Sequence, residues 1–311
     1  MQASPRFAAV FPGQGSQSLN MLGALAQTNP IIKATFADAS DALGFDLWAL
    51  CQNGPESELN RTENTQPALL TASVAVYSLW SKRSGNVPAI MAGHSLGEYS
   101  AYVCAGAMQL QDAVRLVRLR GQLMQNAVPD GVGAMAAILN GEDELITRIC
   151  AQVAENEIVA PANFNSPGQV VISGHKTAVE RALLALKAAG VKRAIVLPVS
   201  VPSHCALMRT IEPVFADALA NTPIQTPAIP VVANVNATAH TDPTRIRECL
   251  LEQLWSPVRW VDSVRALHAH RIGEFGPGRV LSGLIKRIDP AIDVRSLEEP
   301  ATFELALTEW N

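Results

Sequence analysis

Cysteine is scarce in this chain, and its placement excludes two classes of small domain. The five cysteines are scattered, odd in number and form no Cys-x-x-Cys pair. Neither a disulfide framework nor a cysteine-based zinc site is therefore predicted. We expect these residues to act as small buried apolar side chains.

Long apolar runs and long basic runs are also missing. No apolar stretch approaches the roughly 18 residues that a membrane span requires, and Met1–Arg6 lacks a signal-peptide pattern. Charged residues make up only 17% of the 311 residues, and the formal net charge is −4. Nucleic acid is not expected as the main partner. The composition predicts a soluble cytoplasmic protein, not bound to a membrane, with one large or two unequal domains.

A glycine-flanked serine is the most informative feature that the chain does contain. Gly93-His94-Ser95-Leu96-Gly97 follows a short apolar run at 89–92 and opens a helix-compatible segment at 98–108. The glycines allow two elements to meet closely, and the strained turn exposes the serine hydroxyl. This favours Ser95 as a nucleophile, with the Leu96 N–H placed at a helix N-terminus to stabilise negative charge. For the pentapeptide alone, a turn with a capping serine is the alternative.

A second glycine-rich loop follows the first predicted strand. The apolar run Phe7–Phe11 breaks at Pro12-Gly13-Gln14-Gly15-Ser16-Gln17. Such loops expose backbone N–H groups, but the spacing fits neither a dinucleotide fingerprint nor a P-loop. The loop is therefore a weak candidate for a phosphate site and could instead supply a second oxyanion-hole N–H.

The order of predicted elements indicates an α/β protein with an insertion. Helical spacing at 31–50 and 67–82 precedes the serine corner, which we place at the C-terminal edge of a mostly parallel sheet. From 133 to 200 the pattern is β-α-β-β-α-β, the order of a ferredoxin-like motif. Its predicted strands lie at 134–139, 158–163, 169–173 and 193–199, and its helices at 142–154 and 177–189. We assign 131–200 to a small inserted domain, and 1–130 with 201–311 to the large domain.

One arginine lies where a charge is costly. In the helix predicted at 111–128, Arg120 falls at the centre of the apolar face. A guanidinium there requires a buried carboxylate or an anionic ligand as its partner. A structural ion pair is the commoner fate of such arginines.

Position along the chain selects one of the six histidines as a base for Ser95. His204 follows the last strand of the small domain, at the seam between domains and downstream of the serine. His94 adjoins the nucleophile and is expected to project away from it. A metal site at His268-x-His270 lacks a third ligand, so no metal site is predicted.

Seven motifs occur in order along the chain. They are Phe11-Pro12-Gly13-Gln14-Gly15-Ser16-Gln17, Gln66-Pro67-Ala68, Gly93-His94-Ser95-Leu96-Gly97-Glu98, Arg120-Gly121, Asn163-Phe164-Asn165-Ser166-Pro167-Gly168-Gln169, Pro202-Ser203-His204 and Glu274-Phe275-Gly276-Pro277-Gly278. Together they resemble the malonyl-CoA:acyl carrier protein transacylases of bacterial fatty acid synthesis, over essentially the whole chain. The resemblance implies a hydrolase-like large domain with a ferredoxin-like insertion.

The resemblance also implies roles for individual residues. Ser95 resembles the nucleophile and His204 the base, which takes the serine proton and later activates the incoming thiol. The backbone N–H groups of Gln14 and Leu96 match the oxyanion hole. Arg120 matches the arginine that grips the malonyl carboxylate through two charge-assisted hydrogen bonds.

Three further positions match with supporting roles. The main-chain carbonyl of Gln253 matches the group that orients the histidine, so that no triad aspartate is required. His94 and Asn163 match positions that line the pocket.

The implied partners are malonyl-CoA and an acyl carrier protein, with no metal or tightly held cofactor, and we expect a monomer. The basic pairs Lys192-Arg193 and Lys286-Arg287 are hypotheses for the surface that meets an acidic carrier, ordinary solvated charge being the alternative. Unchanged transfer to the carrier after charge reversal at both pairs would exclude them.

Three rival functions remain at this stage. A serine hydrolase would share Ser95 and His204 but has no need of Arg120. A malonyl transferase for polyketide synthesis or malonate decarboxylation would differ only in its carrier. A non-catalytic scaffold would form no acyl adduct on the serine.

Overall fold

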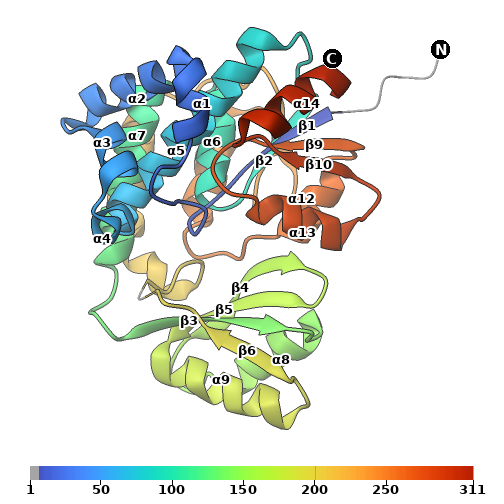
Figure 1. The fold of residues 1–311 in the computed structure, drawn as a ribbon. Helices are drawn as coiled ribbons and strands as arrows, with labels where there is room; N and C mark the ends of the chain where they lie inside the picture. Colours follow the sequence, from blue (N-terminus) through green and yellow to red (C-terminus); the bar gives the residue numbers. More distant parts are fainter. Residues whose placement is uncertain (1–6, 200, 311) are drawn as a thin grey trace.

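The structure, a computed structural model, describes residues 7–199 and 201–310 and contains two β-sheets (Figure 1). The larger sheet has six strands in the order β10-β9-β1-β2-β7-β8. All neighbouring pairs in it are parallel except β7 and β8. Its strands are β1 Phe7–Phe11, β2 Ile90–Gly93, β7 Val231–Val232, β8 Ala239–His240, β9 Arg271–Glu274 and β10 Asp293–Ser296.

Strand β1 shows why this sheet forms at the centre of the molecule. All five of its residues are apolar and buried. Because successive side chains point to opposite faces, Ala9 and Phe11 join one apolar cluster, whereas Ala8 and Val10 join a second. Helices cover both faces, as a parallel sheet requires. The second cluster includes residues of the helices α12 (Trp260–Ala266) and α13 (Val280–Ile288). The first includes residues of α5 (Thr62–Arg83), α6 (Leu96–Cys104) and α7 (Leu110–Gln125).

Most of the elements packed around the large sheet are helices (Figure 1). Before the small sheet they are α1 Gly23–Thr28, α2 Pro30–Leu43, α3 Leu47–Asn53, α4 Glu56–Leu59, α5 Thr62–Arg83, α6 Leu96–Cys104 and α7 Leu110–Gln125. After it come the 3-10 helix η1 Ala206–Ile211, α10 Glu212–Asn221, α11 Pro243–Glu252, α12 Trp260–Ala266, α13 Val280–Ile288 and α14 Pro300–Trp310.

The smaller sheet lies below the larger one in Figure 1 and is antiparallel throughout. Its strands run in the order β4-β5-β3-β6. They are β3 Gly133–Leu139, β4 Val159–Ser166, β5 Gln169–His175 and β6 Arg193–Val196, with helices α8 Asp143–Val153 and α9 Lys176–Ala188 between them. Side chains of both helices and the sheet form a separate apolar cluster, so this part has its own core.

Several predicted element boundaries are wrong; the strand predicted at 193–199, for example, ends at Val196. Helix α5 begins at Thr62 and contains Pro67, whereas the prediction starts this helix at residue 67. Burial of most of this helix outweighs the one backbone hydrogen bond that the proline removes. The helix predicted at 31–50 is split into α2 and α3, because Gly44 adopts a left-handed conformation with φ of 77°.

Strand β4 differs from the prediction at its C-terminal end. It continues to Ser166 through two register irregularities, which keep it paired with β5. Only Pro167-Gly168 remains as the turn. Met1–Arg6 and Ser200, on which the signal-peptide and domain-boundary predictions bear, lie outside the described residues. Within the described part of the chain, no helix combines the length and apolar character needed to cross a membrane.

The corner between β2 and α6 depends on two glycines. A Cβ on Gly97 would overlap the carbonyl oxygen of Phe11 in the neighbouring strand, and a Cβ on Gly93 would overlap the Gly97 carbonyl. The start of α6 therefore packs directly on the backbone of β1 and β2. This close approach places the residue between the glycines, Ser95, at the C-terminal edge of the parallel strands.

Replacing Gly97 by alanine is expected to destabilise the protein by about 3 kcal/mol, because the new methyl group meets rigid backbone. Gly283→Ala is the matched control: Gly283 is exposed in α13, and a Cβ there has no neighbour within 4 Å. That change should instead stabilise by about 0.5–1 kcal/mol through helix propensity. Urea denaturation of the two variants measures both values. Equal stability of the two variants would refute the packing argument.

Candidate active site

Ser95 occupies a strained backbone position between β2 and α6. Its φ and ψ angles are 52° and −107°, an unusual conformation for a residue with a side chain. Asn234 supports this turn from the loop after β7: its Oδ1 accepts from the Ser95 N–H at 2.7 Å, and its Nδ2 donates to the Gly93 carbonyl at 2.7 Å. The turn is thus fixed by hydrogen bonds on both sides of the serine.

His204 lies against the serine hydroxyl with a defined tautomer. Its Nε2 is 2.8 Å from Ser95 Oγ, and its Nδ1 is 2.8 Å from the main-chain carbonyl of Gln253. A carbonyl can only accept, so Nδ1 carries the hydrogen and Nε2 is left as the acceptor for the serine proton. The backbone N–H of His204 also donates to the Leu254 carbonyl at 3.1 Å. The imidazole is therefore oriented as a base by main-chain groups.

The charge state of His204 suits that orientation. Burial, followed by the positive charge of Arg120, lowers the pKa of His204 from 6.5 to about 3. The imidazole is accordingly neutral at physiological pH in the free protein. Neutral imidazole is the form that can accept a proton from Ser95.

Arg120 is buried on α7 with only 1% of its surface exposed. Its Nη1 donates to Gln66 Oε1 and its Nη2 to Gln253 Oε1, both at 2.9 Å. The same Nη2 lies 3.4 Å from Ser95 Oγ. No carboxylate within residues 7–199 and 201–310 forms an ion pair with it. The guanidinium charge is thus met by neutral amide oxygens and faces the serine, which leaves a site for an anion.

The two predicted oxyanion-hole residues lie on adjoining backbone. The loop after β1 packs on the serine corner: the His94 N–H donates to the Phe11 carbonyl at 3.0 Å, and a Cβ on Gly13 would come within 2.5 Å of the His94 carbonyl. Leu96 is the first residue of α6, so its N–H has no acceptor inside the helix. Gln14, on that loop, is anchored through its side chain, which accepts from Thr62 Oγ1 at 2.9 Å.

His94 and Asn163, the predicted pocket residues, lie on the side of the small sheet. His94 Nε2 is 2.8 Å from Asn165 Oδ1, and its ring contacts Trp260 at a centroid separation of 5.4 Å. Asn163 is buried on β4, where its backbone pairs with Val258. In the described part of the chain, the Asn163 side chain forms no hydrogen bond with Ser95 or His204.

Sequence reasoning missed four polar groups of the site. They are the Gln66, Glu98 and Asn234 side chains and the amide of Gln253, all fully or almost fully buried. Burial raises the pKa of Glu98 to about 7, although hydrogen bonds from Gln253 and Asn234 oppose the change. Spacing offered one usable signal: Glu98 follows Ser95 by one helical turn, so its side chain lies beneath the serine.

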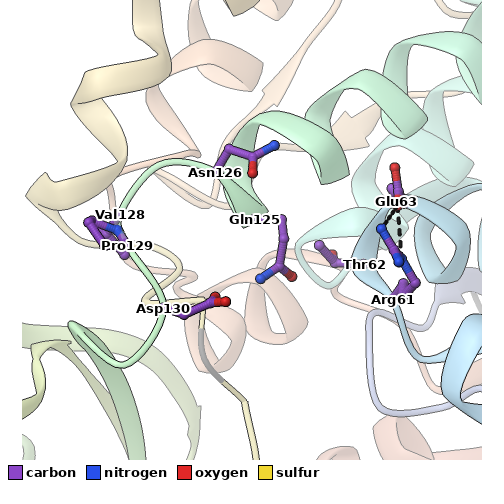
Figure 2. Close-up of a pocket in the computed structure, with 8 residues that line it drawn as sticks. All are labelled: Arg61, Thr62, Glu63, Gln125, Asn126, Val128, Pro129 and Asp130. Atoms are coloured by element: carbon purple, nitrogen blue, oxygen red, sulfur yellow. Dashed lines mark hydrogen bonds and ion pairs between the residues drawn. The ribbon is translucent and has the colours of Figure 1, made fainter.

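A pocket of about 600 Å³ opens beside this site, where the chain leaves α7 for the small sheet (Figure 2). Thr62 on its wall links it to the loop of Gln14. Its charged lining residues are Arg61, Glu63 and Asp130, and Arg61 is paired with Glu63. The pocket therefore offers no net positive charge to a phosphate group, and neither Ser95 nor His204 lines it.

Metal coordination has no candidate in the described ranges, because no cluster of three or more His, Cys, Asp or Glu side chains occurs there that could hold an ion.

Known proteins are similar to this chain over nearly its whole length. The chain matches the family described as acyl transferase domain over residues 9–274. It is 55% identical over 307 residues to the malonyl CoA-acyl carrier protein transacylase of Salmonella typhimurium, covering 98% of this chain and 99% of that relative. The crystal structure of malonyl-CoA:acyl carrier protein transacylase from Xanthomonas oryzae pv. oryzae is similar with a TM-score of 0.97 and 54% identity, covering 99% of both chains.

A further solved structure is of a malonyl-transacylase in complex with a type II PKS acyl-carrier protein. It is similar with a TM-score of 0.96 and 53% identity, covering 97% of this chain and 99% of that chain. The chain belongs to the acyl transferase family and, within it, to the malonyl CoA-acyl carrier protein transacylases.

Proposed function

We propose that this protein moves a malonyl group from malonyl-CoA to the phosphopantetheine thiol of an acyl carrier protein, through a malonyl-serine intermediate, for type II fatty acid synthesis. The observation that carries the proposal is the position of Arg120. A buried guanidinium, which donates to two neutral amide oxygens and has no ion pair in the described part of the chain, lies 3.4 Å from the hydroxyl that His204 can deprotonate. An acyl group that reacts at Ser95 and ends in a carboxylate fits both features.

The reaction proceeds in two balanced half-reactions. Ser95 Oγ bonds to the thioester carbonyl carbon while its proton passes to His204 Nε2. The N–H groups of Gln14 and Leu96 stabilise the negative charge on the carbonyl oxygen. The carbon–sulfur bond then breaks, and the coenzyme A sulfur takes the proton from the imidazole. The carrier thiol repeats these steps in the opposite sense, giving its proton to His204 and releasing Ser95.

The chain needs no metal or tightly held cofactor in this scheme, since His204 handles the proton and backbone N–H groups handle the charge. The Gln253 carbonyl orients the histidine in place of a triad carboxylate. His94 and Asn163 line the acyl pocket from the side of the small sheet. The acyl carrier protein is proposed as partner because a malonyl-transacylase of this fold has been solved with such a carrier.

The fold supports a finer description as well. The small sheet's β-α-β-β-α-β order and its β4-β5-β3-β6 arrangement fit a ferredoxin-like domain, proposed for 131–200. The parallel sheet with its serine corner fits a hydrolase-like domain, proposed for 1–130 and 201–311. A monomer in the cytoplasm remains our expectation.

A lasting malonyl group on Ser95 is the expected result when the purified protein is mixed with malonyl-CoA without carrier. Intact mass and peptide mapping measure it, with Ser95→Ala as the variant that should form no adduct.

In Arg120→Ala, malonyl transfer should fall far more than acetyl transfer, because only the malonyl group uses the guanidinium.

Other outcomes would identify a rival. Free malonate or acetate without an adduct would indicate a serine hydrolase, and no turnover at all would indicate a scaffold. Equal losses on malonyl-CoA and acetyl-CoA in Arg120→Ala would remove the carboxylate role.

The reactivity of Ser95 should be nearly independent of pH across the ordinary histidine range. Because the pKa of His204 is lowered to about 3, its neutral form persists as the pH falls through 6.5. The rate of inactivation by an uncharged sulfonyl fluoride, which does not use Arg120, should change little between about pH 5.5 and 7.5. If the base were a histidine with an ordinary pKa of about 6.5, the inactivation rate would fall about tenfold between about pH 7.5 and 5.5. A fall centred near pH 6.5 would contradict the assigned charge state.

A further inference from the structure

Behind the serine corner lies a buried carboxylate that the proposed reaction does not use. Glu98 stands in the first turn of α6 with no exposed surface. Its Oε2 accepts from Gln253 Nε2 at 2.6 Å and from the Asn234 N–H at 3.1 Å, while its Oε1 has no partner in the described part of the chain. Both donors belong to residues that hold the site together.

The Gln253 side chain bridges Glu98 and Arg120. Its Nε2 donates to Glu98 Oε2 and to the Ser95 carbonyl at 3.1 Å, and its Oε1 accepts from Arg120 Nη2. An amide has a donor end and an acceptor end. Glu98 Oε2 and the Ser95 carbonyl both accept from the amide nitrogen, so together they select the orientation in which the amide oxygen faces Arg120. The reverse orientation would set the amide hydrogens against the guanidinium.

The amide also keeps the carboxylate away from direct contact with Arg120. A carboxylate bonded to the guanidinium would form a resident ion pair and compete with a carboxylate on the substrate. With Gln253 between them, Glu98 supplies negative charge nearby, while Nη2 still faces Ser95 Oγ at 3.4 Å. Arg120 thus keeps Nη2 directed at Ser95 without an ion pair to a carboxylate in the described part of the chain.

We propose that Glu98 is a positioning residue for substrate recognition, which fixes the Gln253 amide so that Arg120 is aimed at acyl groups ending in a carboxylate. The inference rests on the proposed malonyl transfer and concerns its substrate class. The Gln253 carbonyl that orients His204 belongs to the main chain and does not depend on how the amide is turned. Glu98 should therefore affect the preference for malonyl over acetyl more than it affects the serine chemistry.

Glu98→Gln tests this with a side chain of the same shape. The new amide can donate as well as accept, so residue 98 no longer favours one orientation of the Gln253 amide, which is then held by the Ser95 carbonyl and Arg120 alone. We expect KM for malonyl-CoA to rise and the ratio of kcat/KM for malonyl-CoA to that for acetyl-CoA to fall about tenfold. Glu98→Asp, which keeps the carboxylate, should retain more of this ratio than Glu98→Gln and gives a second reading.

Glu274→Gln is the matched control. Glu274 is also fully buried, and burial raises its pKa to about 7 as well. Its oxygens accept from the Leu281 and Ser282 N–H groups at the start of α13, and no hydrogen bond within residues 7–199 and 201–310 joins them to Ser95 or Arg120. Glu274→Gln should therefore leave the ratio of kcat/KM for malonyl-CoA to that for acetyl-CoA at the wild-type value.

Two results would overturn the role of Glu98 alone. One is an equal fall of kcat/KM for both thioesters in Glu98→Gln, and the other is the same loss of preference in Glu274→Gln. A wild-type protein that forms no malonyl-serine would instead overturn the proposed function, and the role of Glu98 with it. The intact-mass measurement on the wild type separates these cases.

Discussion

The burial of one positive charge determines how the rest of this site is built. Arg120 is buried on α7 and forms no ion pair with a carboxylate in the described part of the chain, and its two terminal nitrogens donate to glutamine oxygens. Burying a charge this way is costly unless every available group is directed at it. The fold meets this requirement by surrounding Arg120 with polar side chains from three separate helix regions: Gln66 on α5, Glu98 on α6 and Gln253 after α11.

The same residues that surround the Arg120 charge also position Ser95 and His204. Gln253 uses its side chain on Arg120 and the Ser95 carbonyl, and its main chain on His204. Asn234 joins Glu98 to the serine turn by accepting from the Ser95 N–H. Because these bonds share partners, the strained turn, the base and the cation form one network. The strain at Ser95 persists because its surroundings over-determine it.

Hydrophobic periodicity and short motifs predict much of the fold and of the site from the sequence, but not all of either. The serine corner could be placed because glycines at 93 and 97 permit a strand and a helix to touch, and Arg120 stood out on an apolar helix face. Helix α5 could not be predicted across Pro67, because its stability comes from tertiary burial and not from local preference. Gln66 and Asn234 were missed for a related reason: a polar residue shows its burial only when distant elements are assembled around it.

Arg120 also connects recognition with reactivity. After burial, its charge is the next largest cause that lowers the pKa of His204, and a base with so low a pKa accepts a proton weakly. An acyl group whose carboxylate neutralises the guanidinium removes that cause and raises the basicity of the imidazole next to Ser95. An uncharged acyl group leaves the positive charge facing the base. In the proposed reaction, this electrostatic link would let the guanidinium that recognises the substrate also affect how readily the serine loses its proton.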